Sequence, residues 1–451
     1  MESPEREVKF TRSAVFSVMW AAAHIAHVTL HGGGTLSDVT MLAVLGAAIW
    51  VLLSPTSTHR LLILAAVQVA DWIWFAPYDP DHWTLVFVVN LTLLITAAAF
   101  RGPVVETALP ALRLLLLVAY GAAAFAKWNS TFLSVAHSCA VWLGGRASFG
   151  VSDHVPGSAP VLIAFALLSE TMVFLLLLHP RTRRYGARLG LAFHAVVSLS
   201  PAIAVSDFTT TVMALFVLFL PLGEVERAVG RVARSVDGSP VWETLKTRRW
   251  IGPAWLIFIA VVAGYSSSEM STMLFWTVSL PYVLVVLWAF LPITSEPAFR
   301  EPSRNDLRPI LTAIPVLVFL GFIVLSPYIG LRTTGAFTMF SNLRTEGSGS
   351  NHYAVSGVHL ADYQNDLVVL ESSSSEGLQD LADDGQALPA IGVRSIALLE
   401  SNVTVVGTRG SEELIWNSSE PDKDLGSMSI FERWMLSFRP VAVTGPPQCG
   451  N

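Results

Sequence analysis

Cysteine and charge are both scarce in this chain of 451 residues. Only Cys139 and Cys449 are present, which excludes a cysteine-rich zinc or iron–sulfur site and a disulfide-built scaffold. Charged residues make up 14% of the chain, against about 25% in soluble domains. With a net charge of −6 and no long basic run, the sequence gives no sign of nucleic-acid binding. Walker, GxSxG and HExxH motifs are also absent, so no common nucleotide, esterase or zinc-protease class is indicated.

Hydrophobic residues, in contrast, make up 53% of the chain and gather in runs long enough to cross a membrane. Basic residues concentrate on alternate connections, and the positive-inside rule then places the N-terminus in the cytoplasm. The sequence therefore predicts an all-α polytopic membrane bundle over 1–331. It has about eleven transmembrane helices, near 14–31, 38–54, 61–77, 83–100, 109–128, 160–178, 185–205, 208–222, 250–266, 271–291 and 309–331.

The segment 332–451 has a different character. Short β-prone runs, such as 367–370 and 403–406, alternate with polar and glycine-rich breaks, and the run 393–400 fits either a short helix or another strand. Because an odd number of spans precedes it, we predict a small extracytoplasmic α+β domain here. Cys139 and Cys449 would then share an oxidising compartment, either as a disulfide or as two free thiols.

Lys127 ends the apolar run 109–128, and a predicted loop of about thirty residues follows it. A lysine in this place is commonly an interfacial anchor whose ammonium group reaches the water. The alternative is a lysine that apolar neighbours keep neutral, so that it can act as a base. Spacing alone leaves both interpretations open.

Glu170 and His194 are predicted at the same depth, near the middle of two consecutive spans. An isolated ionisable group there costs about 2.5–3.5 kcal/mol on insertion scales, and a hydrogen-bonded pair costs less. We therefore predict that Glu170 contacts His194, either as a structural pair between helices or as part of a reactive site. Asp71, at a similar depth, is a further partner for either residue.

His24, His27 and His31 are spaced by three and four residues, which places them on one face of a helix. Such a set can ligate a metal ion or haem, or can form a polar stripe that faces the interior of a bundle. No carboxylate stands between residues 13 and 37 to support ligation. The three histidines are therefore weak metal candidates.

Two segments resemble motifs of the HTTM family, which includes the vitamin K-dependent γ-carboxylases. The segment 124–129 (AFAKWN), with the Trp and glycines of 142–145, resembles the family signature A-G-x-K-L-[ND]…W…G. The segment 81–85 (DHWTL) resembles the family's Asn-His-x-x-Leu.

Two further matches follow in the same order. Glu170, ahead of 180–183 (PRTR), resembles the helix-embedded Glu that precedes an arginine-rich turn in the family, and 193–194 resembles its Phe-His. The resemblance covers 14–222 and is weaker to 331. The segment 335–341 loosely resembles the aromatic-Met entry to the extracytoplasmic domain of the γ-carboxylases.

The resemblance implies a function. In the γ-carboxylases the matching Lys is the base that activates reduced vitamin K, and the matching His assists it. By resemblance, the cofactors are a reduced vitamin K-like quinone, O2 and CO2. The implied reaction is quinone epoxidation coupled to carboxylation, or another modification, of a secreted peptide or protein. The residues so implied are Lys127 and His82 for catalysis, and Trp128, Asn129, Glu170 and His194 for cofactor binding.

Two departures from the γ-carboxylases bear on this assignment. Ala126 stands where the animal enzymes have a basic residue, and the C-terminal region is shorter than their peptide-binding region. The same superfamily contains membrane factors that help to mature or export a secreted peptide without quinone chemistry, and this is the alternative function. A transporter or a structural membrane protein is the third. Bound quinone or an epoxide product would distinguish the first from the others.

Overall fold

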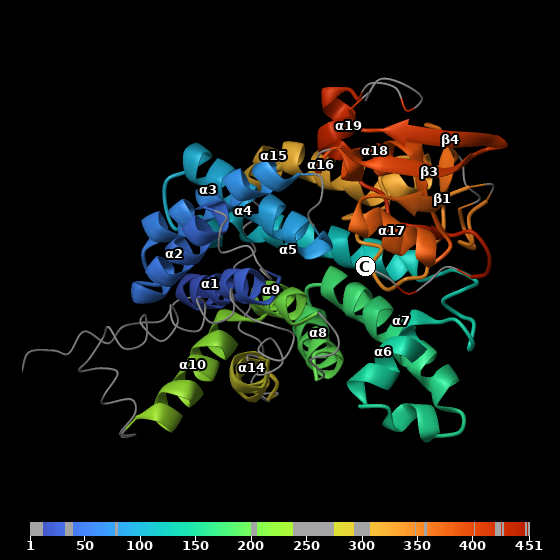
Figure 1. Cartoon of the computed structure of the whole chain (residues 1–451). Coiled ribbons are helices and arrows are strands. Elements are labelled where there is room, and N and C mark those ends of the chain that lie inside the picture. The colour runs from blue at the N-terminus through green and yellow to red at the C-terminus, as the bar shows by residue number, and fades with distance from the viewer. Residues whose placement is uncertain are drawn as a thin grey trace, which may run out of the picture.

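The computed structural model describes residues 12–31, 39–76, 80–199, 205–237, 275–292, 307–347, 349–355, 359–400, 402–419, 425, 428–446 and 449. Most of this part of the chain is helical, and the helices form one bundle with a small sheet at one end (Figure 1). The bundle helices are α1 (Arg12–His31), α2 (Val39–Leu53), α3 (Thr58–Phe75), α4 (Asp81–Ala99), α5 (Val104–Ala126), α7 (Ser158–Leu178), α8 (Arg183–Val197), α9 (Ser206–Val217), α10 (Leu222–Val236), α14 (Leu280–Phe290), α15 (Arg308–Thr312) and α16 (Ile314–Leu325).

The predicted bundle of about eleven transmembrane helices is wrong. Within the described ranges, three helices are long and apolar enough to cross a membrane, namely α4, α5 and α7. Other predicted spans form shorter helices, such as α9 and α16 with 12 residues each. At 1.5 Å per residue such a helix covers about 18 Å, less than a hydrocarbon core of about 30 Å. The predicted span 250–266 lies outside the described residues.

Helix α9 shows why apolar runs overestimate the number of spans. All of its residues except Phe208 are buried, and it packs against α1, α8 and α4. The apolar run 212–217 of α9 can face either lipid or a protein core, and hydropathy does not distinguish the two. Here the protein itself supplies the apolar surroundings.

The C-terminal part contains an antiparallel sheet in the order β4-β3-β1-β2-β5. The predicted strands at 367–370 and 403–406 are confirmed, and the ambiguous run 393–400 is largely helical. The sheet packs on its own core, which includes Val368, Leu388, Val405 and Trp416. Its elements are β1 (Leu367–Ser373), α17 (Glu376–Asp383), β2 (Gln386–Pro389), α18 (Ala390–Ala397), β3 (Thr404–Arg409), β4 (Glu412–Asn417), α19 (Ile430–Met435) and β5 (Val441–Ala442).

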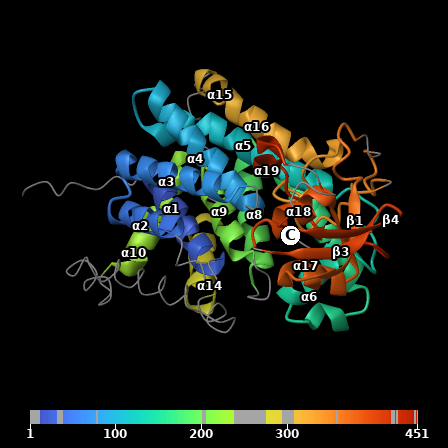
Figure 2. The same ribbon diagram turned by 45° about the horizontal axis from the view of Figure 1, so that its top comes forward.

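Figures 1 and 2 place the sheet beyond the C-terminal end of α5. Two links hold it there. Asn129 is fully buried, and its Nδ2 donates to the carbonyls of Ala126 and Ser341 at 2.8 and 2.6 Å. A disulfide joins Cys139 to Cys449 across 310 residues of sequence, which settles the choice left open between a disulfide and free thiols.

A buried ion pair stabilises the segment that leads into the sheet. Arg439 Nε donates to Glu346 Oε1 at 3.0 Å, and Glu346 is 1% exposed. Burial alone would raise the pKa of the Glu346 carboxyl. The guanidinium of Arg439, together with the Thr345 N–H, outweighs burial and lowers this pKa below its usual value.

We predict that this pair makes the fold sensitive to acid. A carboxyl whose pKa is depressed by folding contributes stability above its unfolded pKa of about 4.3 and loses that contribution as the pH falls below it. Glu346→Gln should cost about 1.5–3 kcal/mol at pH 7 and progressively less towards pH 3.5. Thermal unfolding in detergent across this range measures the difference, with exposed Glu413→Gln as the control. A pH-independent cost would contradict the ionic role.

Candidate functional site

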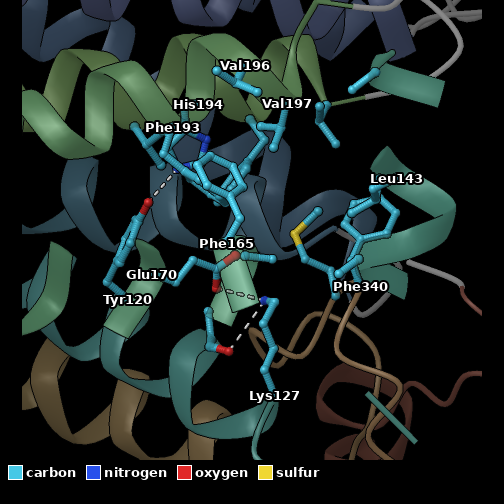
Figure 3. A pocket seen from close by; sticks show the side chains of 18 of the residues that line it. Tyr120, Lys127, Leu143, Phe165, Glu170, Phe193, His194, Val196, Val197 and Phe340 are labelled. Carbon is cyan, nitrogen blue, oxygen red and sulfur yellow. Dashed lines mark hydrogen bonds and ion pairs between the residues drawn. The ribbon is translucent and has the colours of Figure 1, made fainter. Parts of the chain in front are cut away.

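A cavity of about 360 Å³ lies where α5, α7, α8 and the loop that precedes the sheet meet (Figure 3). Its lining is mostly aliphatic and aromatic, with a few polar side chains. Apolar walls with few polar groups are typical of sites that bind small molecules. The polar or ionisable members of the lining are Asp81, Tyr120, Lys127, Ser148, Glu170 and His194.

Helix α6 (Cys139–Ala147) forms one wall of the cavity, within the segment that the sequence predicts as a long loop. Ser138 caps this helix by accepting from the Ala140 N–H at 3.2 Å. A Cβ on Gly144 would lie 2.5 Å from a methyl carbon of Leu162 in α7, so any larger residue there would require the Leu162 side chain to move. Part of the predicted loop is therefore a helix, and its apolar residues line the cavity.

Lys127 and Glu170 form an ion pair in the cavity wall, with Nζ 2.8 Å from Oε2. Their side chains are 7% and 12% exposed. The ammonium group also lies 3.5 Å from the carbonyl oxygen of Ala123, at the C-terminal end of α5, where the helix dipole favours a cation. Lys127 thus points into the protein and is not an interfacial anchor.

Tyr120 and His194 form the second polar pair, with Oη 2.6 Å from Nε2 (Figure 3). The predicted contact between Glu170 and His194 is wrong: Glu170 pairs with Lys127, and His194 pairs with Tyr120. The two residues do share the cavity wall. The Nδ1 of His194 is buried and has no hydrogen-bond partner within the described part of the chain. Several other buried side-chain atoms of the described residues also lack a partner, and this nitrogen is notable because its residue lines the cavity.

The loop 335–343 closes the cavity on the side of the sheet. Phe337 and Phe340 line the cavity and have φ angles of 60° and 52°, which L-residues rarely adopt. Contacts on both sides hold the loop: Asp81 Oδ2 accepts from the Met339 N–H at 3.3 Å, and Ser341 is bound by Asn129. Backbone strain of this kind persists only where the surroundings determine the conformation, and it is common at ligand sites.

His82 lies outside the cavity lining, in a buried cluster with His27 and Asp207. Asp207 Oδ2 is 2.7 Å from His82 Nε2 and 3.4 Å from His27 Nδ1. The two ring nitrogens are 3.0 Å apart. Of the two residues that the resemblance implies for catalysis, Lys127 lines the cavity and His82 belongs to this cluster instead.

The other predicted site residues have structural surroundings. Trp128 is 43% exposed, and Asn129 links α5 to the loop 335–343; neither lines the cavity. His24 lies 2.7 Å from the carbonyl oxygen of Trp20, apart from His27. Asp71 accepts from Thr40 and Trp83 rather than from Glu170 or His194. The side chain of His31 lies outside the described residues.

Two site residues escaped the sequence analysis. Tyr120 precedes Lys127 by seven residues, or two helical turns, so a helical projection places both on one face. Asp207 stands in the first turn of α9, in a polar segment that precedes the apolar run 212–217. Neither pattern is specific. Each, however, marks a polar side chain that is expected to face the protein interior, because contact with lipid is unfavourable for it.

No protein-family model, no curated protein and no solved structure matches this chain. The resemblance to the HTTM family thus depends on the four motifs alone and stays a hypothesis.

We predict that Lys127 and Glu170 are energetically coupled. Glu170→Gln leaves a buried ammonium without its carboxylate and should cost about 3–5 kcal/mol. The double variant Lys127→Met/Glu170→Gln should cost less than the sum of the single changes. Thermal unfolding in detergent measures the cycle, and the pair Lys127→Met and Glu413→Gln is the additive control. Additive costs for Lys127 and Glu170 would contradict the ion pair.

Proposed function

We propose that the cavity binds a quinone or quinol and that the Lys127–Glu170 pair moves a proton from its hydroxyl group. The unsatisfied Nδ1 of His194 carries this proposal. If Tyr120 donates its proton to Nε2, the neutral imidazole bears its own proton on Nδ1. Such a donor, in an apolar cavity, suits the carbonyl oxygen of a quinone or the oxyanion of a deprotonated quinol.

The ion pair determines which state of Lys127 can act. An ammonium group has no lone pair, so Lys127 can be a base only after its proton has passed to Glu170. After this transfer Glu170 is a neutral carboxylic acid, and Lys127 is a neutral amine next to the cavity. Glu170 therefore acts as the residue that receives the proton of Lys127, a role that the motif resemblance does not state.

Three of the residues implied by the resemblance support this function, because Lys127, Glu170 and His194 line one cavity. The subsequent chemistry, with O2 and CO2 acting on a secreted substrate, is proposed from the resemblance only. The disulfide between α6 and Cys449 supports placing this side of the protein in an extracytoplasmic, oxidising compartment. Maturation or export of a secreted peptide is the alternative if no quinone binds.

A larger side chain in the cavity should abolish quinone binding. Ala166 lines the cavity in α7, whereas Ala164 is exposed on the same helix and does not. We expect Ala166→Phe to weaken binding of a naphthoquinone at least tenfold, about 1.4 kcal/mol, because the ring occupies space needed by the ligand. Ala164→Phe is the matched control and should bind as the wild type does.

Quenching of tryptophan fluorescence by the quinone, in detergent, measures this binding. Equal affinity in both variants would place the ligand elsewhere. No affinity in the wild type would remove the quinone proposal and favour the maturation alternative.

Replacement of Lys127 distinguishes a base from a structural cation. Lys127→Arg keeps the positive charge and the partner of Glu170, but a guanidinium does not deprotonate at usable pH. The variant should bind quinone and lose turnover of the reduced form by at least about 100-fold. Epoxide formation from a reduced naphthoquinone and O2 is the readout. Equal product from the wild type and the variant would eliminate the base role.

A further inference from the structure

We infer that His27, His82 and Asp207 form a binding site for a divalent transition-metal ion. One helix supplies each residue: α1, α4 and α9. All three residues are buried, with exposed fractions of 3%, 2% and 1%. The candidate ligand atoms, two imidazole nitrogens and one carboxylate oxygen, lie within 4.8 Å of one another.

The spacing of these atoms fits a metal. The edges of the triangle measure 2.7, 3.0 and 3.4 Å. Adjacent ligands on a six-coordinate ion, at bond lengths of about 2.1 Å, lie about 3.0 Å apart. The triangle thus has the size of one face of a coordination sphere.

The donor types indicate which ions fit. Two imidazoles with one carboxylate suit Fe(II), Zn²⁺ and Co²⁺, whereas Mg²⁺ and Ca²⁺ prefer oxygen ligands. Three ligands on one face leave the remaining positions open. The set differs from His24, His27 and His31, the three histidines that share one helix face. Only His27 belongs to both sets, and the other two ligands, His82 and Asp207, come from α4 and α9.

Neighbouring groups hold the ligands in place. The ring of Trp83 stacks on that of His27 with centroids 3.8 Å apart and an interplanar angle of 13°. The backbone N–H of Phe208 donates to the other carboxylate oxygen of Asp207 at 2.7 Å. Such supporting contacts fix ligand orientation at metal sites.

The site lies next to the cavity without being part of it. Asp81 and Phe208, the chain neighbours of His82 and Asp207, both line the cavity. The ring of Phe208 lies between the two sites, 6.3 Å from the His82 ring and 5.3 Å from the His194 ring. A metal here joins three helices behind one wall of the cavity.

Titration of the purified full-length protein with Co²⁺ tests the inference. We expect visible d–d absorption that saturates at one ion per chain, is displaced by Zn²⁺, and accompanies a higher melting temperature. His27→Gln and Asp207→Asn should each lose these bands. His24→Gln is the matched control, since it removes a buried histidine of the same helix, and should retain them.

Several results would overturn the site. The first is a wild type that shows neither Co²⁺ bands nor thermal stabilisation by Zn²⁺, a measurement that needs no variant. The second is a set of bands that His27→Gln or Asp207→Asn retains. The third is equal loss in a folded His24→Gln.

Discussion

The ion pair between Lys127 and Glu170 constrains the centre of this structure. Both charged groups are buried, and burial of either charge costs several kcal/mol unless the oppositely charged partner is next to it. The pair therefore sets how α5 and α7, two of the helices long enough to cross a membrane, are turned towards each other. The cavity follows from this orientation, because the helix faces that carry the two charges also carry its lining.

The polar groups of the bundle are arranged in pairs and small clusters rather than dispersed. Tyr120 with His194 forms one pair, and His27, His82 and Asp207 form a cluster of three. Each group of side chains comes from different helices, so each is also a cross-link that specifies helix packing. What distinguishes His194 is the remaining ring nitrogen, which the described residues leave unsatisfied.

Part of this arrangement is predictable from sequence. The presence of Glu170 and His194 at one place in the bundle, and two strands of the sheet, follow from patterns of polar and apolar residues. The hydrogen-bond and ion-pair partners of these residues cannot be predicted in this way, because the position of a residue along a helix does not determine the direction in which its side chain points around the axis. Glu170 and His194 reach the same level and still turn to different residues. Asp207, 180 residues from His27, can be matched to it only in three dimensions.

The predicted number of membrane spans is wrong for a related physical reason. Hydropathy measures transfer out of water and does not record whether lipid or protein receives the side chain. Helix α9 is buried in protein, and its apolar residues resemble those of a lipid-facing helix. The boundary between bundle and C-terminal domain, placed at 331 and 332, stays a prediction, since the loop 335–343 serves both parts.

The disulfide between Cys139 and Cys449 carries a consequence for biosynthesis. Cys449 follows every described helix and strand along the chain, whereas Cys139 begins α6, in the first half. During synthesis, Cys139 therefore cannot form its disulfide until a further 310 residues have been added and Cys449 is present. The cavity wall that α6 forms can therefore gain its covalent link only after the chain has been synthesised through Cys449.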